Sequence, residues 1–224
     1  MDLANQTVIS SVSHIAQPTK SYQIDSVSPA GSLCYRLVKR LFDILFSLCL
    51  GVITCPFLII IGLLIRLDSH GKALYIQERV GKNGKIFRML KFRTMVENAE
   101  QGVPVWADTD DPRCTRLGKK LREWRIDELP QLWNIFIGDM TLVGPLPERQ
   151  CFYDQFETYI HGFSNRLSVT PGLTGLAQVN GGYDLLPEEK IVYDMEYISK
   201  RGFWLDFKII CRTAKVVCNK EGVK

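Results

Sequence analysis

An uninterrupted apolar run, Ile44 to Ile65, constrains the fold of this 224-residue chain more than any other feature of its sequence. The run holds no charged side chain. A helix that rises about 1.5 Å per residue over this length can cross the roughly 30 Å hydrocarbon core of a bilayer. We therefore expect a membrane segment. Because the run is too long and begins too far into the chain for a secretory signal, we expect it to be retained.

Two features of this run argue against a straight crossing. Cys55 and Pro56 lie near its middle, and proline removes one backbone hydrogen bond and clashes with the preceding turn, so a kink is predicted there. Positive residues prefer the cytoplasmic side of a membrane. Both flanks of the run are basic, with Lys39, Arg40, Arg66 and Lys72. A re-entrant hairpin keeps both flanks on one side, whereas a proline-kinked span does not, and this stretch alone leaves both open.

The rest of the chain divides around this segment. Residues 1–30 are rich in polar residues without a hydrophobic period, which predicts a disordered or loosely attached tail. Residues 31–70 form the membrane-associated element, and residues 71–224 are expected to form one cytosolic domain. The seven cysteines include no Cys-x-x-Cys pair, so neither a disulfide framework nor a zinc site is favoured. The net charge of +4 suits an anionic surface or a phosphate-bearing substrate, but the excess is small.

A β-hairpin is predicted directly after the membrane element. Leu74 to Val80 and Ile86 to Phe92 are strand-like, and the Asn83-Gly84 pair between them tolerates the positive φ angles of a tight turn. The hairpin is basic, with Lys82, Lys85, Arg88, Lys91 and Arg93. These side chains either form a solvated face or contact phosphates and lipid headgroups.

Two acidic groups are candidate catalytic or metal-binding sites. Asp108 and Asp110 match the Asp-x-Asp pattern that holds a divalent metal in many glycosyltransferases, although the match is short and is also typical of a turn. Asp127 and Glu128 follow a strongly basic stretch and precede Pro130, which predicts a helix N-terminus that favours anions. One of these two carboxylates can attack phosphorus while the other orients it or holds Mg²⁺. The alternative, which composition alone favours, is that they only cap the helix.

Several long motifs give the sequence a resemblance to a known family. They are KRLFD (39–43), the proline-broken apolar run, QERVGKNGKIFRMLKFRTM (77–95), DPRCTRLGKKLR (111–122), DELPQLWNIFIGDMTLVGP (127–145) and PGLTGLAQVNG (171–181). In these motifs the chain resembles the bacterial sugar transferases, the monotopic phosphoglycosyl transferases that begin the assembly of capsule, exopolysaccharide, O-antigen or glycoprotein glycans. The resemblance covers Lys39 to about Val223.

The resemblance implies a membrane enzyme that transfers a sugar 1-phosphate from a UDP-sugar to undecaprenyl phosphate. We expect an α+β fold, predominantly helical with short antiparallel strands. The resemblance further implies a catalytic domain that rests on the cytoplasmic face of the bacterial inner membrane through a re-entrant helix bent at Pro56. Membrane lipids are expected partners and nucleic acid is not. A homodimer is compatible with the sequence, although no heptad repeat supports one.

The resemblance also implies roles for individual residues. Asp127 would attack the β-phosphate and form a phosphosugar-aspartyl intermediate with release of UMP, and the lipid phosphate would displace it in a second step. Glu128 would assist with positioning and, together with Asp127, would hold Mg²⁺. The residues expected to contact phosphate are Arg122, Lys91, Arg93, Arg116 and Gln178.

Three departures from the family pattern keep other functions open. Leu146, Thr170 and Gly182 stand where the family commonly has basic residues, a loss that Arg149 or Arg166 could offset. One alternative is an Asp-x-Asp glycosyltransferase, which would release UDP in place of UMP. The other is a non-catalytic membrane adaptor of the same fold.

The C-terminal region predicts two amphipathic helices. They span Ile191 to Val217 and are broken at Gly202. The second carries Phe203, Trp204 and Phe207 beside basic residues. Such a helix either lies in the membrane interface or packs in the core with a solvated back.

Overall fold

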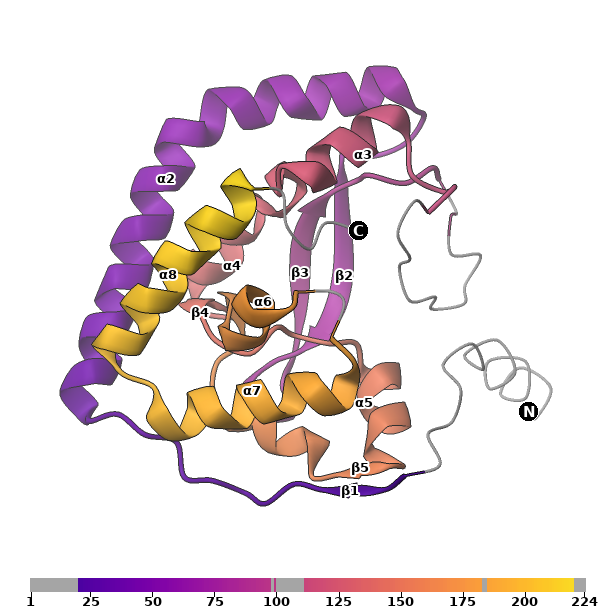
Figure 1. Ribbon diagram of the computed structural model, residues 1–224. Helices are drawn as coiled ribbons and strands as arrows, with labels where there is room; N and C mark the ends of the chain where they lie inside the picture. Colours follow the sequence, from indigo (N-terminus) through magenta and orange to yellow (C-terminus); the bar gives the residue numbers. More distant parts are fainter. Residues whose placement is uncertain (1–19, 98, 100–110, 183–184, 220–224) are drawn as a thin grey trace.

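The computed structural model describes residues 20–219 except 98, 100–110 and 183–184. Asp108 and Asp110 therefore lie outside the described residues. Figure 1 shows the helices and strands. Their order is β1 (Tyr22–Gln23), α2 (Leu33–Asp68), β2 (Leu74–Val80), η1 (Lys82–Gly84), β3 (Ile86–Phe92), α3 (Arg116–Glu123), η2 (Ile126–Glu128), α4 (Gln131–Ile137), β4 (Thr141–Val143), α5 (Gln150–Glu157), β5 (Ile160–His161), η3 (Phe163–Ser168), β6 (Gly172–Thr174), α6 (Leu176–Asn180), α7 (Pro187–Lys200) and α8 (Phe203–Cys218).

The long apolar run forms helix α2. Ser32 caps its start by accepting a hydrogen bond from the backbone N–H of Tyr35, and the helix continues through Pro56. It is long and apolar enough to cross a membrane, and only 6% of its most apolar window is buried. Figure 1 shows that α2 borders the domain on two sides and changes direction between them. The domain leaves most of this apolar surface uncovered, which is the pattern of a helix that lipid surrounds.

Both ends of α2 contact the rest of the chain. Near its start, the Asp43 carboxylate is 3% exposed and accepts hydrogen bonds from the Thr141 hydroxyl (2.6 Å) and the Leu142 N–H (3.0 Å) at β4. Near its end, Ile65 packs with Phe92 of β3 and Leu121 of α3 in a small apolar cluster. The element is therefore clamped at both ends by one and the same domain.

The strands form three two-stranded sheets within the described residues. β2 and β3 pair in antiparallel register from Leu74↔Phe92 to Val80↔Ile86, and Asn83 has a φ of 56°, which confirms the predicted hairpin. The pairs β1–β5 and β4–β6 are parallel instead. The prediction of antiparallel strands is therefore wrong for these two sheets, because each joins segments that are distant in the sequence.

The main core lies between the sheets and the C-terminal helices. Its most buried members include Ile135, Phe156, Ile160, Ile191 and Ile198. Tyr22 pairs with Ile160 across β1 and β5, and Ile24 and Val27 pack against the core. The expectation of a loosely attached tail therefore does not hold for residues 22–30, whose apolar side chains find partners in the domain.

Candidate active site

The acidic pair lies in a short turn between two helices. Arg125, just after α3, has a φ of 56° and a ψ of 18°, a left-handed conformation that residues other than glycine rarely adopt. Asp127 and Glu128 follow in η2, and Pro130 leads into α4. The pair was predicted at a helix N-terminus. It belongs to a separate 3₁₀ turn that ends before α4 begins, and the left-handed Arg125 sets the direction of that turn.

Basic side chains from two elements surround the pair. Lys91 of β3 lies 3.3 Å from Glu128 Oε1, and Arg125 lies 3.8 Å from the same atom. Asp127 is 7% exposed. Burial, and next the charge of Glu128, raise the pKa of Asp127 to about 6, while Lys91, Arg122 and Arg125 act to lower it. A buried carboxyl whose pKa is raised inside a cluster of cations is a candidate nucleophile or acid–base group.

Arg122 is held by a residue in the segment that follows β3. Its Nε donates a hydrogen bond of 2.9 Å to the hydroxyl of Thr94, which directly follows the Arg93 after β3. Thr94 is 6% exposed. Thr94 is not among the site residues expected from the sequence, and its location within the 77–95 motif is the only sequence signal that points to it. The site is thus built from β3, the residues after it, α3 and η2.

Similarity to known proteins extends over this whole site. Residues 34–220 match the pattern of the bacterial sugar transferase family. The chain belongs to the bacterial sugar transferase family. It is 39% identical over 205 residues to the UDP-N-acetylgalactosamine-undecaprenyl-phosphate N-acetylgalactosaminephosphotransferase of Aeromonas hydrophila, covering 90% of this chain and 48% of that protein.

Two further relatives carry other sugars in their names. The UDP-glucose:undecaprenyl-phosphate glucose-1-phosphate transferase of Caulobacter vibrioides is 39% identical over 201 residues, covering 86% of this chain and 75% of that protein. The undecaprenyl-phosphate galactose phosphotransferase of Salmonella typhimurium is 36% identical over 202 residues, covering 84% and 42%. The chain spans about half the length of the Aeromonas relative and less of the Salmonella one.

The other residues predicted to contact phosphate in this family member are dispersed. Arg93 donates to the carbonyl oxygens of Ile65, Ser69 and His70, at the end of α2. Arg116 is exposed at the start of α3, and Gln178 lies on α6 with a buried Oε1. Lys91 and Arg122 thus lie at the acidic pair, whereas the Arg93 guanidinium binds carbonyl oxygens at the end of α2.

Arg166, a candidate to offset the missing basic residues, is buried in the interior of the domain. It is 2% exposed, lies 2.6 Å from Asp194 Oδ2 and donates to the carbonyl oxygen of Leu146. Its guanidinium also lies over the ring of Phe163, 5.0 Å from the centroid. Arg166 therefore ties η3 to α7 and does not replace a surface cation.

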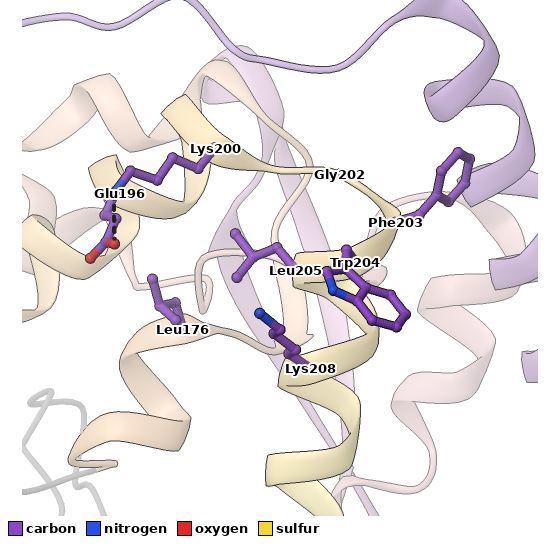
Figure 2. Close-up of a pocket in the computed structure, with 8 residues that line it drawn as sticks. All are labelled: Leu176, Glu196, Lys200, Gly202, Phe203, Trp204, Leu205 and Lys208. Atoms are coloured by element: carbon purple, nitrogen blue, oxygen red, sulfur yellow. Dashed lines mark hydrogen bonds and ion pairs between the residues drawn. The ribbon is translucent and has the colours of Figure 1, made fainter.

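A hollow lies among the C-terminal helices, and neither residue of the acidic pair lines it. It has a volume of about 550 Å³ and is lined by residues of α6, α7 and α8, including Leu176, Leu205 and Lys208. Figure 2 shows the ion pair of Glu196 and Lys200 beside it, with Phe203 turned toward α2. None of the residues predicted for the reaction lines this hollow.

The same region confirms the two C-terminal helices broken at Gly202. Phe203, Trp204 and Phe207 of α8 are each more than half exposed, and the rings of Trp204 and Phe207 stack with centroids 5.7 Å apart. These aromatic side chains are therefore not core residues.

Proposed function

We propose that this chain transfers a sugar 1-phosphate from a UDP-sugar to undecaprenyl phosphate and releases UMP. Such a transfer would be the first membrane step of capsule, exopolysaccharide, O-antigen or glycoprotein glycan synthesis. The observation that carries the proposal is the buried Asp127 carboxyl, which lies beside Glu128 within the field of Lys91, Arg122 and Arg125. The names of the relatives, which are undecaprenyl-phosphate sugar phosphotransferases, support the same reaction class.

Asp127 would act as the nucleophile in two successive displacements. In the first, a carboxylate oxygen of Asp127 attacks the β-phosphorus that bears the sugar. The bond from this phosphorus to the bridging oxygen breaks, and UMP leaves with the electron pair. In the second, an oxygen of the lipid phosphate attacks the same phosphorus and the Asp127 carboxylate leaves. Lys91, Arg122 and Arg125 offset the negative charge that both steps bring together.

Mg²⁺ fits the donor set of this site. The described residues contain no cluster of three or more metal-ligating side chains, but Mg²⁺ is usually held by one or two carboxylates together with substrate phosphates. Asp127 and Glu128 offer two adjacent carboxylates of this kind. Mg²⁺ bound there would offset the charge of the donor diphosphate.

We propose that α2 is a re-entrant helix at the cytoplasmic face of the inner membrane. Asp43, near its start, and Ile65, near its end, both contact the same domain, and a straight crossing would separate them by the thickness of the bilayer. Pro56 between them supplies the cause of a bend. The exposed aromatic residues of α8, next to Lys208, would lie at the headgroup level.

Nucleotide release by the purified protein tests this function. The protein in detergent or nanodiscs is given undecaprenyl phosphate, Mg²⁺ and a panel of UDP-sugars that includes the N-acetylgalactosamine, glucose and galactose forms. We expect UMP release that requires the lipid phosphate and disappears in Asp127→Asn. Asp154→Asn, which removes an exposed carboxylate on α5 that accepts from Gln150, is the matched control and should retain activity.

Two other outcomes would favour a different function. Release of UDP that survives Asp127→Asn would favour the Asp-x-Asp glycosyltransferase with Asp108 and Asp110. No turnover with any donor, together with retained binding of lipid phosphate, would favour the membrane adaptor. A phosphosugar adduct on a peptide that contains Asp127, detected by mass spectrometry after incubation with donor alone, would support the two-step route directly.

A further inference from the structure

Thr94 is fixed in place by the helix that carries Arg122. The carbonyl oxygen of Thr94 accepts a hydrogen bond of 2.9 Å from the N–H of Thr115, which caps the start of α3. Gly118, in the first turns of α3, lies directly against the same carbonyl, because a Cβ there would be 2.0 Å from this oxygen. The backbone of Thr94 and helix α3 therefore form one rigid unit, and Thr94 has little freedom to move relative to Arg122.

The hydroxyl of this residue contacts Arg122 at one defined nitrogen. Thr94 Oγ1 accepts from Arg122 Nε at 2.9 Å, and Thr94 is 6% exposed, so water seldom competes for this contact. A guanidinium is planar, so a hydrogen bond at Nε fixes the direction in which its two terminal nitrogens point. The positive charge of Arg122 reaches Asp127: together with Lys91 and Arg125 it acts to lower the pKa of that carboxyl, whereas Glu128 raises it.

We propose that Thr94 is a positioning residue that sets the plane of the Arg122 guanidinium for contact with the donor phosphates. The inference rests on the proposed function, because it concerns how Arg122 meets a phosphate at the acidic pair. It adds to that function a residue that touches neither substrate nor Asp127 and acts only through Arg122. An arginine that is correctly charged but misdirected would bind phosphate less well in the transition state.

Three single variants separate positioning from packing. Thr94→Val keeps the shape and removes the acceptor, Thr94→Ser keeps the acceptor, and Thr158→Val is a matched control at an exposed hydroxyl on the end of α5. We expect Thr94→Val to lower kcat by about tenfold to a hundredfold with a smaller change in KM. Thr94→Ser should retain most of the activity, and Thr158→Val should match the original protein. The melting temperature of each variant shows whether the fold is intact.

A double variant tests whether the effect passes through Arg122. In an Arg122→Lys background the guanidinium is absent, so Thr94→Val should cause little further loss of kcat. Equal losses in Thr94→Val and Thr94→Ser, or an undiminished effect in the Arg122→Lys background, would overturn the proposal.

A spectroscopic readout keeps this test separate from the proposed function. In protein labelled with ¹⁵N-arginine, the Arg122 Nε–H resonance, assigned by its loss in Arg122→Lys, should exchange slowly with water. It should exchange fast in Thr94→Val and remain slow in Thr94→Ser. If the original protein forms no UMP, the proposed function fails, but this resonance still reports whether Thr94 orients the guanidinium. Fast exchange in the original protein would overturn the positioning role.

Discussion

Lys39 Nζ lies 2.7 Å from Asp206 Oδ2, so an ion pair joins the start of the long apolar helix α2 to helix α8. Asp206 also accepts hydrogen bonds from the hydroxyls of Tyr35 (2.8 Å) and Tyr197 (2.9 Å). Both charged side chains are largely buried. Lys39 is the first residue of the KRLFD motif, and its ion pair holds helix α8 against the start of α2.

Breaking this contact should destabilise the protein strongly. Asp206→Asn removes the charge and leaves Lys39 buried without its counter-ion, a change that typically costs about 3 kcal/mol or more. For a chain of this size, about 3 kcal/mol corresponds to a fall in melting temperature of roughly 6 to 12 °C. Glu196→Gln removes the exposed pair with Lys200 and should change stability by less than about 1 kcal/mol. Thermal unfolding in one detergent compares the two, and similar shifts would contradict the prediction.

Replacing the proposed nucleophile should stabilise the metal-free protein at neutral pH. Burial raises the pKa of Asp127 from its ordinary value of 3.8 to about 6, so the folded chain binds this proton more tightly than the unfolded chain. The free energy of unfolding therefore falls as pH rises from about 4 to about 6, by about 1.4 kcal/mol for each unit of the pKa shift.

Asp127→Asn removes this penalty. The variant should melt at a higher temperature than the original protein at pH 8 in the presence of EDTA, and the difference should vanish near pH 4. A difference that is the same at both pH values would show that the charge of Asp127 is not its cause.

Variants of Arg93 and Lys91 should show that the first side chain stabilises the fold and the second binds substrate. Arg93 donates to the carbonyl oxygens of Ile65 and Ser69, so Arg93→Gln should cost about 2 kcal/mol of stability and leave the KM for the UDP-sugar nearly unchanged. Lys91→Gln should instead raise that KM, because it removes a cation next to Glu128. Melting temperature and donor KM are measured for both variants. A raised KM with unchanged stability in Arg93→Gln would restore its predicted role in phosphate binding.

A methyl group at Gly118 should disrupt the junction of α3 with the strand residues. Gly118→Ala places a Cβ 2.0 Å from the carbonyl oxygen of Thr94, so α3 must shift and carry Arg122 with it. Both activity and stability should fall. Gly51→Ala is the control, since nothing lies within 4 Å of a Cβ there, and alanine favours a helix by about 1 kcal/mol. Equal behaviour of the two variants would contradict the prediction.

Local patterns predicted the parts of the fold that depend on neighbouring residues. The bounds of β2 and β3 follow from strand-like stretches around Asn83-Gly84, and the break at Gly202 follows from helical periodicity. Contacts between distant segments were not predictable in this way. The parallel pairing of β4 with β6 depends on the path of the chain through the whole domain, and no local pattern encodes it.

The residues of the candidate site were predicted only in part. The roles expected of Asp127, Glu128, Arg122 and Lys91 come from the resemblance to the family, because composition alone favours a helix cap for the acidic pair. The resemblance also implied a phosphate contact for Arg93, but the direction of its side chain depends on where α2 ends in space. Thr94 escaped notice because a single hydroxyl carries no signal until its partner is known.

The sequence separation between Asp43 and its hydrogen-bond partner Thr141 has a consequence for folding during synthesis. Its partner Thr141 lies 98 residues further along the chain, so a ribosome adding about 5 to 20 residues per second makes the two several seconds apart. The apolar helix emerges first, when the segments that clamp it do not yet exist. In the re-entrant placement proposed above, the bilayer would receive α2 before the segments that hold its two ends are made, and the later polypeptide would fold onto it.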